Sequence, residues 1–598
     1  MPLSNTQYAR ITWWGVLLAA ALSSSAGAIT IAKDGSSTAT IVVGEGSSEA
    51  VRHAARELQF FLKEVTGAEL PLAAKGKRGS PRILVGPQAA RMADARFATE
   101  ALGTEGLVIR TVGRDLILSG GEPRGTLYAV YTFLEDYVGC HWWATDASTI
   151  PRQRDLKFEK LDVRYVPPFD YREPNWDTAM NRDWAVRNKV FGLFIPLDAE
   201  TGGRPVIAAP SHSFLYQIPA SRYFQSHPEW FSEVDGKRIP EGGQLCLSNE
   251  ELRREMTRVI LEGLRTATNP THVSIAQNDG GRPCQCAKCR AMDAEEGSPA
   301  GGILRLVNAV GEEVAKEFPK VLISTFAYTY SQPAPKFTRP RDNVVVWLCT
   351  MGCSYNLPLA EHKKNAGFAR DLADWGKIAR HLYIWDYTTN FRHYLFIHPN
   401  LRVLGPNLRF FLTNHVSGVF EQGATGTPGA EFAELRSWVL AKLLWNPHLD
   451  DRKLVDQFLA GYYGPAGEHI GAYINLIHDT MQAGLQSLGC YEQPDRRFMK
   501  FETLSKAWSH MQAAERAVSD SPVLLKRVKL AQMPMMYAFM IRWADLRKQA
   551  AKLHADWPMP DDPRQVLADF KARAAAIGIT RVSELETFDK LEANLKLP

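Results

Sequence analysis

Three carboxylates stand where predicted buried strands end, and their placement suits acid–base chemistry. Asp279 follows the apolar run 272–276, Asp386 follows 382–385, and Glu421 follows 416–420. In a (β/α)8 barrel the active site lies at the carboxyl ends of the strands, so the three groups are expected to converge on one mouth. Glycoside hydrolysis uses a carboxylic acid to protonate the leaving oxygen and a second carboxylate to activate water or stabilise the oxocarbenium-like centre. We therefore predict Asp279 as the general acid, Glu421 as the base or nucleophile, and Asp386 as an assisting group.

The alternative for these three residues is a structural role. Asp279 would then cap the next segment, and Asp386 and Glu421 would pair with arginines. A general acid would also need apolar walls or neighbouring carboxylates to stay protonated near neutrality. Other catalytic chemistries lack their motifs, since the sequence contains no Gly-x-Ser-x-Gly elbow, no His-Glu-x-x-His helix and no P-loop.

Aromatic and amide side chains near the same strand ends are candidate sugar contacts. Flat amphipathic rings suit carbohydrate faces, and the loops carry hydrogen-bond donors beside them. His212, which stands between two serines, is expected to contact a ligand hydroxyl rather than to act as a base. The predicted substrate-binding residues are Asn175, Trp176, Arg187, His212, Asn278, Tyr328, Trp385, Tyr387 and Asn390.

Four cysteines have the spacing of a structural site. Cys284, Cys286 and Cys289 lie close together, and Cys246 precedes them. Such a set can hold zinc tetrahedrally, or it can form one or two disulfides that fix a loop; both alternatives stay open. A catalytic zinc is not expected, because no nearby histidine or carboxylate motif completes an open site. No other cofactor is predicted.

Periodicity divides the chain into three folded parts. Residues 29–165 predict a small α/β domain, with strands at 40–43 and 83–85, a helix over 50–65, a hairpin around 113–115 and a second helix over 126–137. Residues 166–445 alternate short strands with helical patterns, which favours a (β/α)8 TIM-like barrel. Its early strands, at 169–172, 190–195 and 244–247, are the least distinct. Residues 446–598 predict an α-helical domain.

The N-terminus predicts export. Arg10 precedes the apolar stretch 11–22, and the small residues 26–28 fit a cleavage site, so residues 1–28 are interpreted as a signal peptide and the protein as periplasmic or secreted. An uncleaved tethering segment is the alternative. No later stretch is long and apolar enough to span a membrane.

The net charge of +5 over 598 residues does not indicate nucleic-acid binding. The oligomeric state stays open.

Several motifs in fixed order resemble known families. Residues 51–65 with the stretch 125–139 resemble the N-terminal accessory domain of bacterial α-glucuronidases and β-hexosaminidases. From His212 to about Tyr463 the chain resembles the domain-of-unknown-function 4838 family of exported bacterial proteins. The matching pieces are 227–231, 244–249, 278–280 with the cysteines that follow, 326–328, 385–387 and 443–447. The resemblance implies a glycoside-hydrolase-like barrel.

The resemblance also bears on roles at the fourth strand. The β-hexosaminidase-like enzymes place an acidic pair there, one residue orienting the acetamido group and the next acting as general acid. This chain instead has Asn278 followed by Asp279. An asparagine cannot hold a negative charge opposite an oxazolinium, so Asn278 argues against a substrate-assisted mechanism. The α-glucuronidases use an acid opposite a carboxylate pair, and Asp279 opposite Glu421 and Asp386 is the analogue.

These observations favour an exported glycoside hydrolase acting on polysaccharide fragments. The first alternative is a carbohydrate-binding protein whose barrel has lost its chemistry, which Asn278 motivates. The second alternative is a polysaccharide lyase, for which the sequence lacks an obvious set of Tyr, His and Arg residues to abstract a proton. In each case the expected partner is a carbohydrate.

Overall fold

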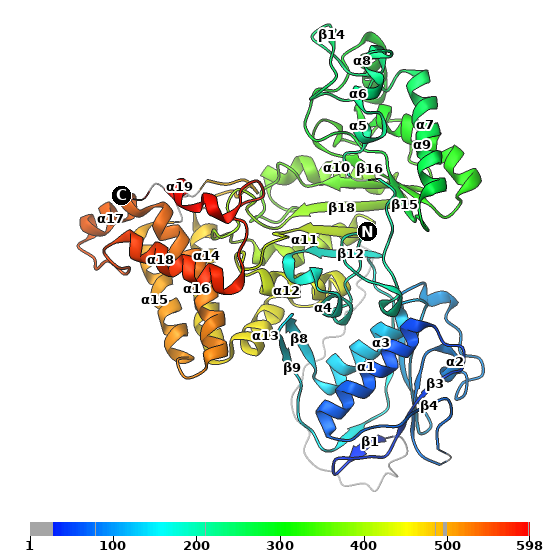
Figure 1. Cartoon of the computed structure of the whole chain (residues 1–598), viewed down its shortest axis with the longest axis vertical. Coiled ribbons are helices and arrows are strands. Elements are labelled where there is room, and N and C mark those ends of the chain that lie inside the picture. The colour runs from blue at the N-terminus through cyan, green and yellow to red at the C-terminus, as the bar shows by residue number, and fades with distance from the viewer. Residues whose placement is uncertain are drawn as a thin grey trace, which may run out of the picture.

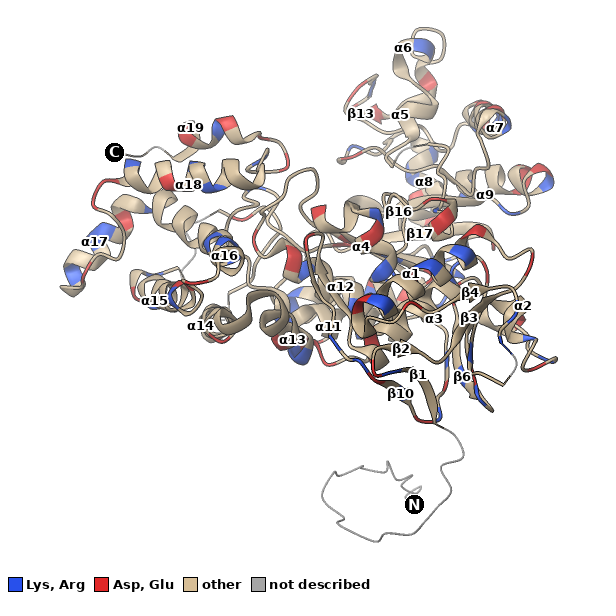
Figure 2. Ribbon diagram, turned by 60° about the horizontal axis from the view of Figure 1, so that its bottom comes forward, with Lys and Arg blue, Asp and Glu red and all other residues tan. Residues whose placement is uncertain are grey.

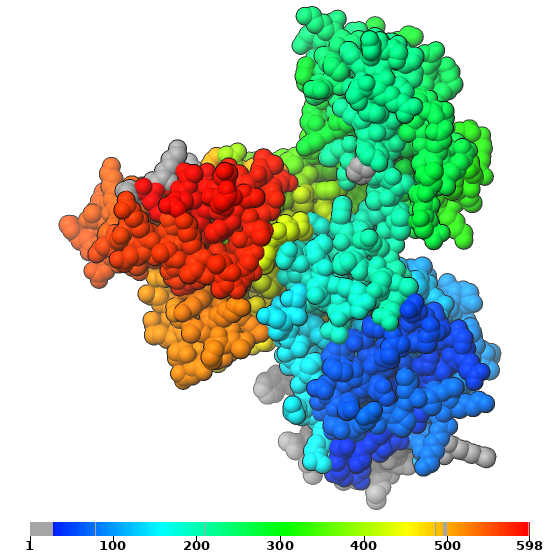
Figure 3. All heavy atoms as spheres, viewed as in Figure 1, coloured from blue at the N-terminus to red at the C-terminus, as the bar shows by residue number. Residues whose placement is uncertain are grey.

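The computed structural model describes residues 28–77, 79–209, 211–484, 486–493, 499–595 and 597. Residues 1–27 of the predicted signal peptide lie outside this range. The chain forms an N-terminal α/β part, a central parallel sheet with an upper group of helices and loops, and a helical C-terminal part (Figure 1). The space-filling view shows the N-terminal part, the upper group and the helical part as separate lobes around the centre (Figure 3).

A six-stranded sheet in the order β11-β6-β7-β5-β3-β4 forms the N-terminal part. The predicted helix is α1 (Glu49–Thr66), which begins at Ser48, whose side chain accepts a hydrogen bond from Val51, and ends at Gly67 with φ +76°. The second predicted helix begins as α3 (Gly125–Phe133). The sheet strands are β3 (Thr40–Val43), β4 (Leu72–Ala73), β5 (Arg82–Val85), β6 (Leu107–Val112), β7 (Asp115–Gly120) and β11 (Asp162–Tyr165). The predicted hairpin is the antiparallel pair of β6 and β7.

Smaller elements complete this part. The strands β10 (Leu156–Phe158), β1 (Ile29–Lys33) and β2 (Ser36–Ser37) form a second sheet, and β8 (His141–Ala144) pairs with β9 (Ala147–Thr149). A short helix, α2 (Pro87–Ala90), follows β5.

The centre of the molecule is a parallel sheet of six strands in the order β12-β19-β18-β17-β16-β15. Its curvature follows from ring contacts, because Tyr171 on one edge strand lies 5.1 Å from Trp347 although two strands separate them. Gly418 makes room for this, since a Cβ there would lie 2.7 Å from the ring of Tyr383. The strands are β12 (Tyr171–Asn175), β15 (His272–Ser274), β16 (Leu322–Ala327), β17 (Val344–Cys349), β18 (His381–Tyr387) and β19 (Val416–Gln422).

The predicted closed eight-stranded barrel is not what the described residues form; the sheet is a curled half-barrel. Residues 190–195 form one antiparallel bridge with β12, at Phe191, and residues 244–247 form one bridge with Phe231. Gly192 packs directly on Glu173 of β12. Ile207 adds a single parallel bridge to β15. Irregular segments therefore stand where the second and third barrel strands were expected.

Helices follow most strands of the half-barrel and cover its outer face. Among them α12 is buried along its whole length. The helices from β12 to β19 and beyond are α4 (Arg182–Arg187), α5 (Phe214–Gln217), α6 (Ala220–Tyr223), α7 (Glu250–Thr266), α8 (Ala287–Glu296), α9 (Ala300–Glu317), α10 (Ala366–Gly376), α11 (Leu401–Thr413) and α12 (Ala433–Trp445). A short hairpin of β13 (Glu233–Val234) and β14 (Lys237–Arg238) lies beside α8.

The C-terminal part is helical, as its periodicity indicated. The methionines of α16, such as Met533, Met536 and Met540, are buried core residues. Its helices are α13 (Asp451–Tyr463), α14 (Gly467–Ala483), α15 (Phe501–Ala517), α16 (Pro522–Ile541), α17 (Trp543–Leu553), α18 (Pro563–Ile577) and α19 (Leu591–Leu595). Within the part of the chain that the structure describes, none of the helices combines the length and the apolar character that a membrane span requires.

Buried ion pairs join the N-terminal part to the half-barrel. Glu105 accepts hydrogen bonds from Arg124 at 2.7 Å and from Arg172 of β12 at 2.6 Å. Glu135 similarly binds Lys189 and Lys442. Elsewhere, acidic and basic residues are dispersed together over the helices and loops (Figure 2). Because unpaired buried charges are costly, these bonded groups fix how the two parts are oriented.

Candidate active site

Aromatic side chains fill the concave face of the half-barrel and define its mouth. Trp385 contacts Phe420 at 4.3 Å and Phe326 at 5.6 Å between ring centroids. Its indole Nε1 donates a hydrogen bond to Oε1 of Gln422 at 2.7 Å, which holds the ring in place. Trp385 stays partly exposed. It therefore keeps a ring surface open at the carboxyl ends of the strands, as a sugar contact requires.

The structure brings Asp386 and Glu421 together. They are register partners on the neighbouring strands β18 and β19. Side chains alternate along a strand, so the pair lies on the face opposite that of Trp385 and Phe420. Both groups are nearly inaccessible, at 4% and 1% exposure. Neither forms an ion pair among the described residues, so the arginine partners of the structural alternative are not found.

The surroundings of Asp386 and Glu421 favour one charged and one neutral carboxyl group near neutrality. Asp386 Oδ1 accepts hydrogen bonds from the Thr350 hydroxyl at 2.6 Å and the Tyr387 amide at 2.8 Å. Burial raises the pKa of Asp386 to about 6, although these bonds oppose the shift. Glu421 Oε2 has no hydrogen-bond partner. Burial first, and the nearby Asp386 carboxylate second, raise the pKa of Glu421 well above its usual value. Near neutrality the pair therefore carries about one negative charge.

Asp279 lies apart from this pair, in the loop that follows the edge strand β15. It is exposed, and the Tyr328 hydroxyl donates a hydrogen bond to its Oδ1 at 3.0 Å. Burial and the Asp279 carboxylate both raise the pKa of Tyr328. The contact is to a tyrosine of the neighbouring strand end, and Asp279 makes no helix-capping bond among those found. The structural alternative for Asp279 is therefore not supported.

His212 and Asn278 shape the loop around Asp279. His212 adopts φ +53°, and its Nδ1 lies 2.8 Å from the Gln277 carbonyl oxygen, which can only accept. Nδ1 therefore carries the proton, and in neutral His212 Nε2 is an acceptor. Asn278 receives a hydrogen bond from the Leu215 amide at 3.1 Å and donates to the Gly243 carbonyl at 2.9 Å. Its amide thus ties three segments together instead of facing a ligand.

Four other residues that were predicted to bind sugar instead contact other parts of the protein. Trp176 is fully buried, and a Cβ on Gly423 would lie 2.2 Å from its ring, so it offers no stacking face. Arg187 pairs with Glu57 of α1 at 2.9 Å and belongs to the junction with the N-terminal part. Asn390, also buried, donates to the backbone carbonyl of Glu492 at 3.0 Å. Sequence position near a strand end did not reveal which way these side chains point.

The fourth is Asn175, which is bonded to a carboxyl group that the sequence analysis missed. Its amide donates to Glu173 Oε1 at 3.2 Å. Glu173 lies on β12, is fully buried on the same face as Tyr171, and accepts a hydrogen bond from the Tyr171 hydroxyl. Burial raises its pKa to about 7. The sequence could have indicated Glu173, because this residue directly follows the expected strand 169–172.

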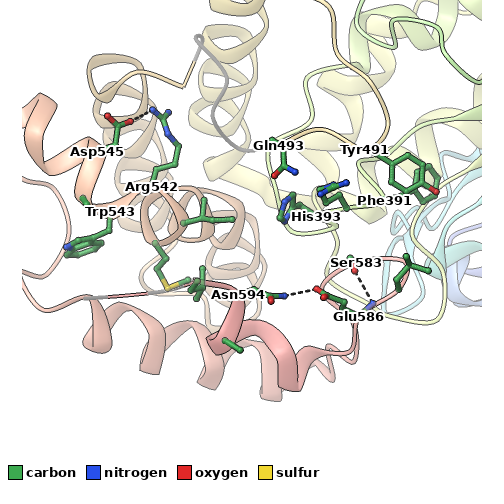
Figure 4. Close-up of a pocket in the computed structure, with 17 residues that line it drawn as sticks. Phe391, His393, Tyr491, Gln493, Arg542, Trp543, Asp545, Ser583, Glu586 and Asn594 are labelled. Atoms are coloured by element: carbon green, nitrogen blue, oxygen red, sulfur yellow. Dashed lines mark hydrogen bonds and ion pairs between the residues drawn. The ribbon is translucent and has the colours of Figure 1, made fainter.

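Tyr387 faces the mouth from β18 and leads to a neighbouring groove. It is 7% exposed, and its ring lies 5.9 Å from that of Phe391. Phe391 and Tyr491 form one end of a cavity of about 880 Å³ beside α16 and α17 (Figure 4). In this cavity Asn594 is bonded to Glu586 at 2.6 Å and Arg542 to Asp545, whereas His393 Nε2 has no hydrogen-bond partner among the described residues. The groove adds surface beside the mouth.

The four predicted cysteine ligands also come together. The sulfurs of Cys246, Cys284, Cys286 and Cys289 all lie within 4.8 Å of one another, and all four are free thiols in the structure. They lie beside the loop that carries Asp279, away from the carboxyl pair. This cluster is the place in the described chain where protein sulfurs could hold a metal.

Family models match most of the folded chain. The model described as domain of unknown function (DUF4838) matches residues 142–475, more than half of the chain. The model described as glycosyl hydrolase family 67 N-terminus matches residues 30–133. Both resemblances inferred from the sequence are thereby confirmed. No curated protein matches the sequence.

Solved structures resemble the chain at low sequence identity. A family GH115 4-O-methyl-α-glucuronidase, BtGH115A, with specificity for decorated arabinogalactans, is 11% identical, with a TM-score of 0.58 over 95% of this chain and 79% of that one. A GH138 enzyme targeting pectin rhamnogalacturonan II is 10% identical, with a TM-score of 0.47 over 92% and 75%. A family 89 glycoside hydrolase from Clostridium perfringens is 10% identical, with a TM-score of 0.47 over 88% and 65%. The first likeness shows a glycoside-hydrolase-like fold.

Proposed function

This chain belongs to the DUF4838 family, and we propose that it is a glycoside hydrolase that works by carboxylic acid and base catalysis. One observation carries the proposal: Asp386 and Glu421 form a buried carboxyl pair at adjacent strand ends, and no cation among the described residues neutralises them. Maintaining such a pair costs stability, and carboxyls with shifted pKa values are what acid–base catalysis uses. The glycoside-hydrolase-like fold supports the same conclusion.

We assign the base to the carboxyl pair and the acid to Asp279. Asp386, with its pKa of about 6, is largely ionised at neutral pH and can accept a proton. Because the pair is buried on the face opposite Trp385, this role requires the ends of β18 and β19 to move and admit the attacking water. Asp279 stands across the sheet from the pair, after the edge strand β15. Tyr328, bonded to Asp279, orients that carboxyl group.

Substrates with different leaving groups distinguish the general acid from the base. Asp279→Asn should abolish turnover of natural glycosides but spare aryl glycosides with acidic leaving groups, because those need little protonation. Glu421→Gln should lose turnover of both. Asp235→Asn is the matched control, since Asp235 is exposed and its φ of +50° suits asparagine. Wild-type turnover of natural glycosides in Asp279→Asn would refute the assignment of the acid.

A binding protein without hydrolysis is the second candidate, and the burial of the pair favours it. With 4% and 1% exposure, Asp386 and Glu421 have no direct path to a ligand in this conformation. Glycan binding that survives Asp279→Asn and Glu421→Gln, with no product from any glycan bound, would establish this function instead. We further propose export to the periplasm or medium, on the residues of the predicted signal peptide.

A further inference from the structure

The cysteine cluster joins two distant stretches of the chain. Cys246 precedes α7, whereas Cys284 and Cys286 follow β15 and Cys289 lies in the first turn of α8. The sulfur of Cys246 lies 3.7 Å from that of Cys286 and 3.8 Å from that of Cys289. All four sulfurs lie within 4.8 Å of one another, so each has several sulfur neighbours.

These distances match a tetrahedral metal site. Four thiolates at about 2.3 Å from zinc stand about 3.8 Å from each other. A disulfide needs one pair of sulfurs at about 2.0 Å and gives neither atom a second partner. We propose that Cys246, Cys284, Cys286 and Cys289 bind one structural zinc ion. The four thiol protons leave to water when the ion binds, and the loaded site carries a net charge of −2.

Hydrogen-bond donors around the sulfurs suit that negative charge. The Glu233 amide donates to Cys284 Sγ at 3.4 Å, and the Arg238 guanidinium donates to the same atom at 3.5 Å. The Ser248 hydroxyl accepts a hydrogen bond from the Cys289 thiol at 3.2 Å and lies 3.5 Å from Cys246 Sγ, and it can donate to one of these sulfurs once they are deprotonated. Donors of this kind stabilise thiolates and orient them, as the surroundings of metal ligands generally do. Arg238 also offsets part of the charge.

The proposed zinc site would hold together the region between β12 and β15, which has little regular strand pairing. Between β12 and β15 the chain contains little sheet apart from the β13–β14 hairpin. Gln244, two residues before Cys246, bonds the Asn278 amide at 2.9 Å and the Asn278 carbonyl at 3.1 Å. It also donates to the Gly281 carbonyl at 3.3 Å. Asp279 lies between these contacts, so the zinc site would hold the loop that carries it. Zinc binding itself does not depend on the proposed function, whereas the role of this loop in catalysis does.

Metal content and thiol titration test the proposal on the full chain, purified without a histidine tag or added metal. Elemental analysis should find about one zinc per chain, and a mercurial reagent should release it after about four equivalents. Cys289→Ser should lose the zinc. Cys140→Ala is the matched control, because Cys140 is also buried but lies outside the cluster, and this variant should keep the zinc.

Hydrogen exchange reports the effect on the Asp279 loop. Release of zinc should increase exchange of amides 277–283 at least tenfold and leave those of β18 unchanged. Peptide mapping that finds disulfides among these four cysteines, or a native chain without zinc, would overturn the proposal. If Cys289→Ser does not fold, the mercurial titration of the wild-type chain decides alone. Zinc present without any change in loop exchange would refute the positioning of Asp279, whatever the hydrolytic assays show.

Discussion

Replacing Asp386 by asparagine should reduce the loss of stability that occurs as pH rises. Burial raises the pKa of Asp386 from 3.8 to about 6 in the folded chain. A carboxyl whose pKa is raised by folding contributes stability that is fully present below the unfolded pKa and is lost as pH rises through the folded pKa. Asp386 should therefore lower the stability of the wild-type protein between about pH 4 and pH 6, and its own contribution should be complete above that range.

The size of the effect follows from the shift. About two pKa units correspond to about 3 kcal/mol of unfolding free energy. Roughly 1.4 kcal/mol of this falls between pH 5 and pH 8, because part of the loss has already occurred at pH 5. In Asp386→Asn this loss disappears. The new Oδ1 can accept the bonds from Thr350 and Tyr387, and the neutral side chain removes a buried charge beside Glu421. The variant should be more stable than wild type at pH 8.

Urea unfolding at pH 5 and pH 8, followed by tryptophan fluorescence, gives the free energies of unfolding. Amide exchange in β18 and β19 shows that the measured opening involves this sheet. Asp556→Asn, at an exposed position, is the matched control and should keep the wild-type difference. If Asp386→Asn loses as much stability between the two pH values as wild type does, the pair does not titrate as its burial implies.

Three further changes test other parts of the structure. Thr350→Val removes a hydrogen bond to a charged carboxyl, worth about 1.5–3 kcal/mol, so the pKa of Asp386 should rise by about one to two units in a carbon-13 NMR titration; no rise would remove Thr350 from this role. Gly423→Ala places a Cβ 2.2 Å from Trp176 and should cost about 1–3 kcal/mol in urea unfolding. Glu105→Gln leaves two buried arginines unpaired and should cost about 3–5 kcal/mol. A neutral outcome in either unfolding experiment would contradict the packing described.

Local pattern determined the helices and most strands. The apolar spacing in 50–65 and the glycine after it specify α1 and its end, because both depend on neighbours within a few turns. Runs such as 344–348 are strands in any sheet that buries them. The polar ends of these strands drew attention to Asp386 and Glu421, and their adjacency in space follows from the order of β18 and β19.

Only the tertiary structure decided which face each side chain occupies and whether the barrel closes. Trp176 and Trp385 were both predicted to contact sugar near strand ends, but Trp176 packs on Gly423 whereas Trp385 lies at the mouth. Glu173 and Asp279 differ in the same way, since burial raises the pKa of Glu173 to about 7 whereas Asp279 is exposed. Strand pairing, burial and the assembly of four sulfurs all join residues far apart in the chain. Periodicity records only near neighbours, so these features emerge when the distant segments pack.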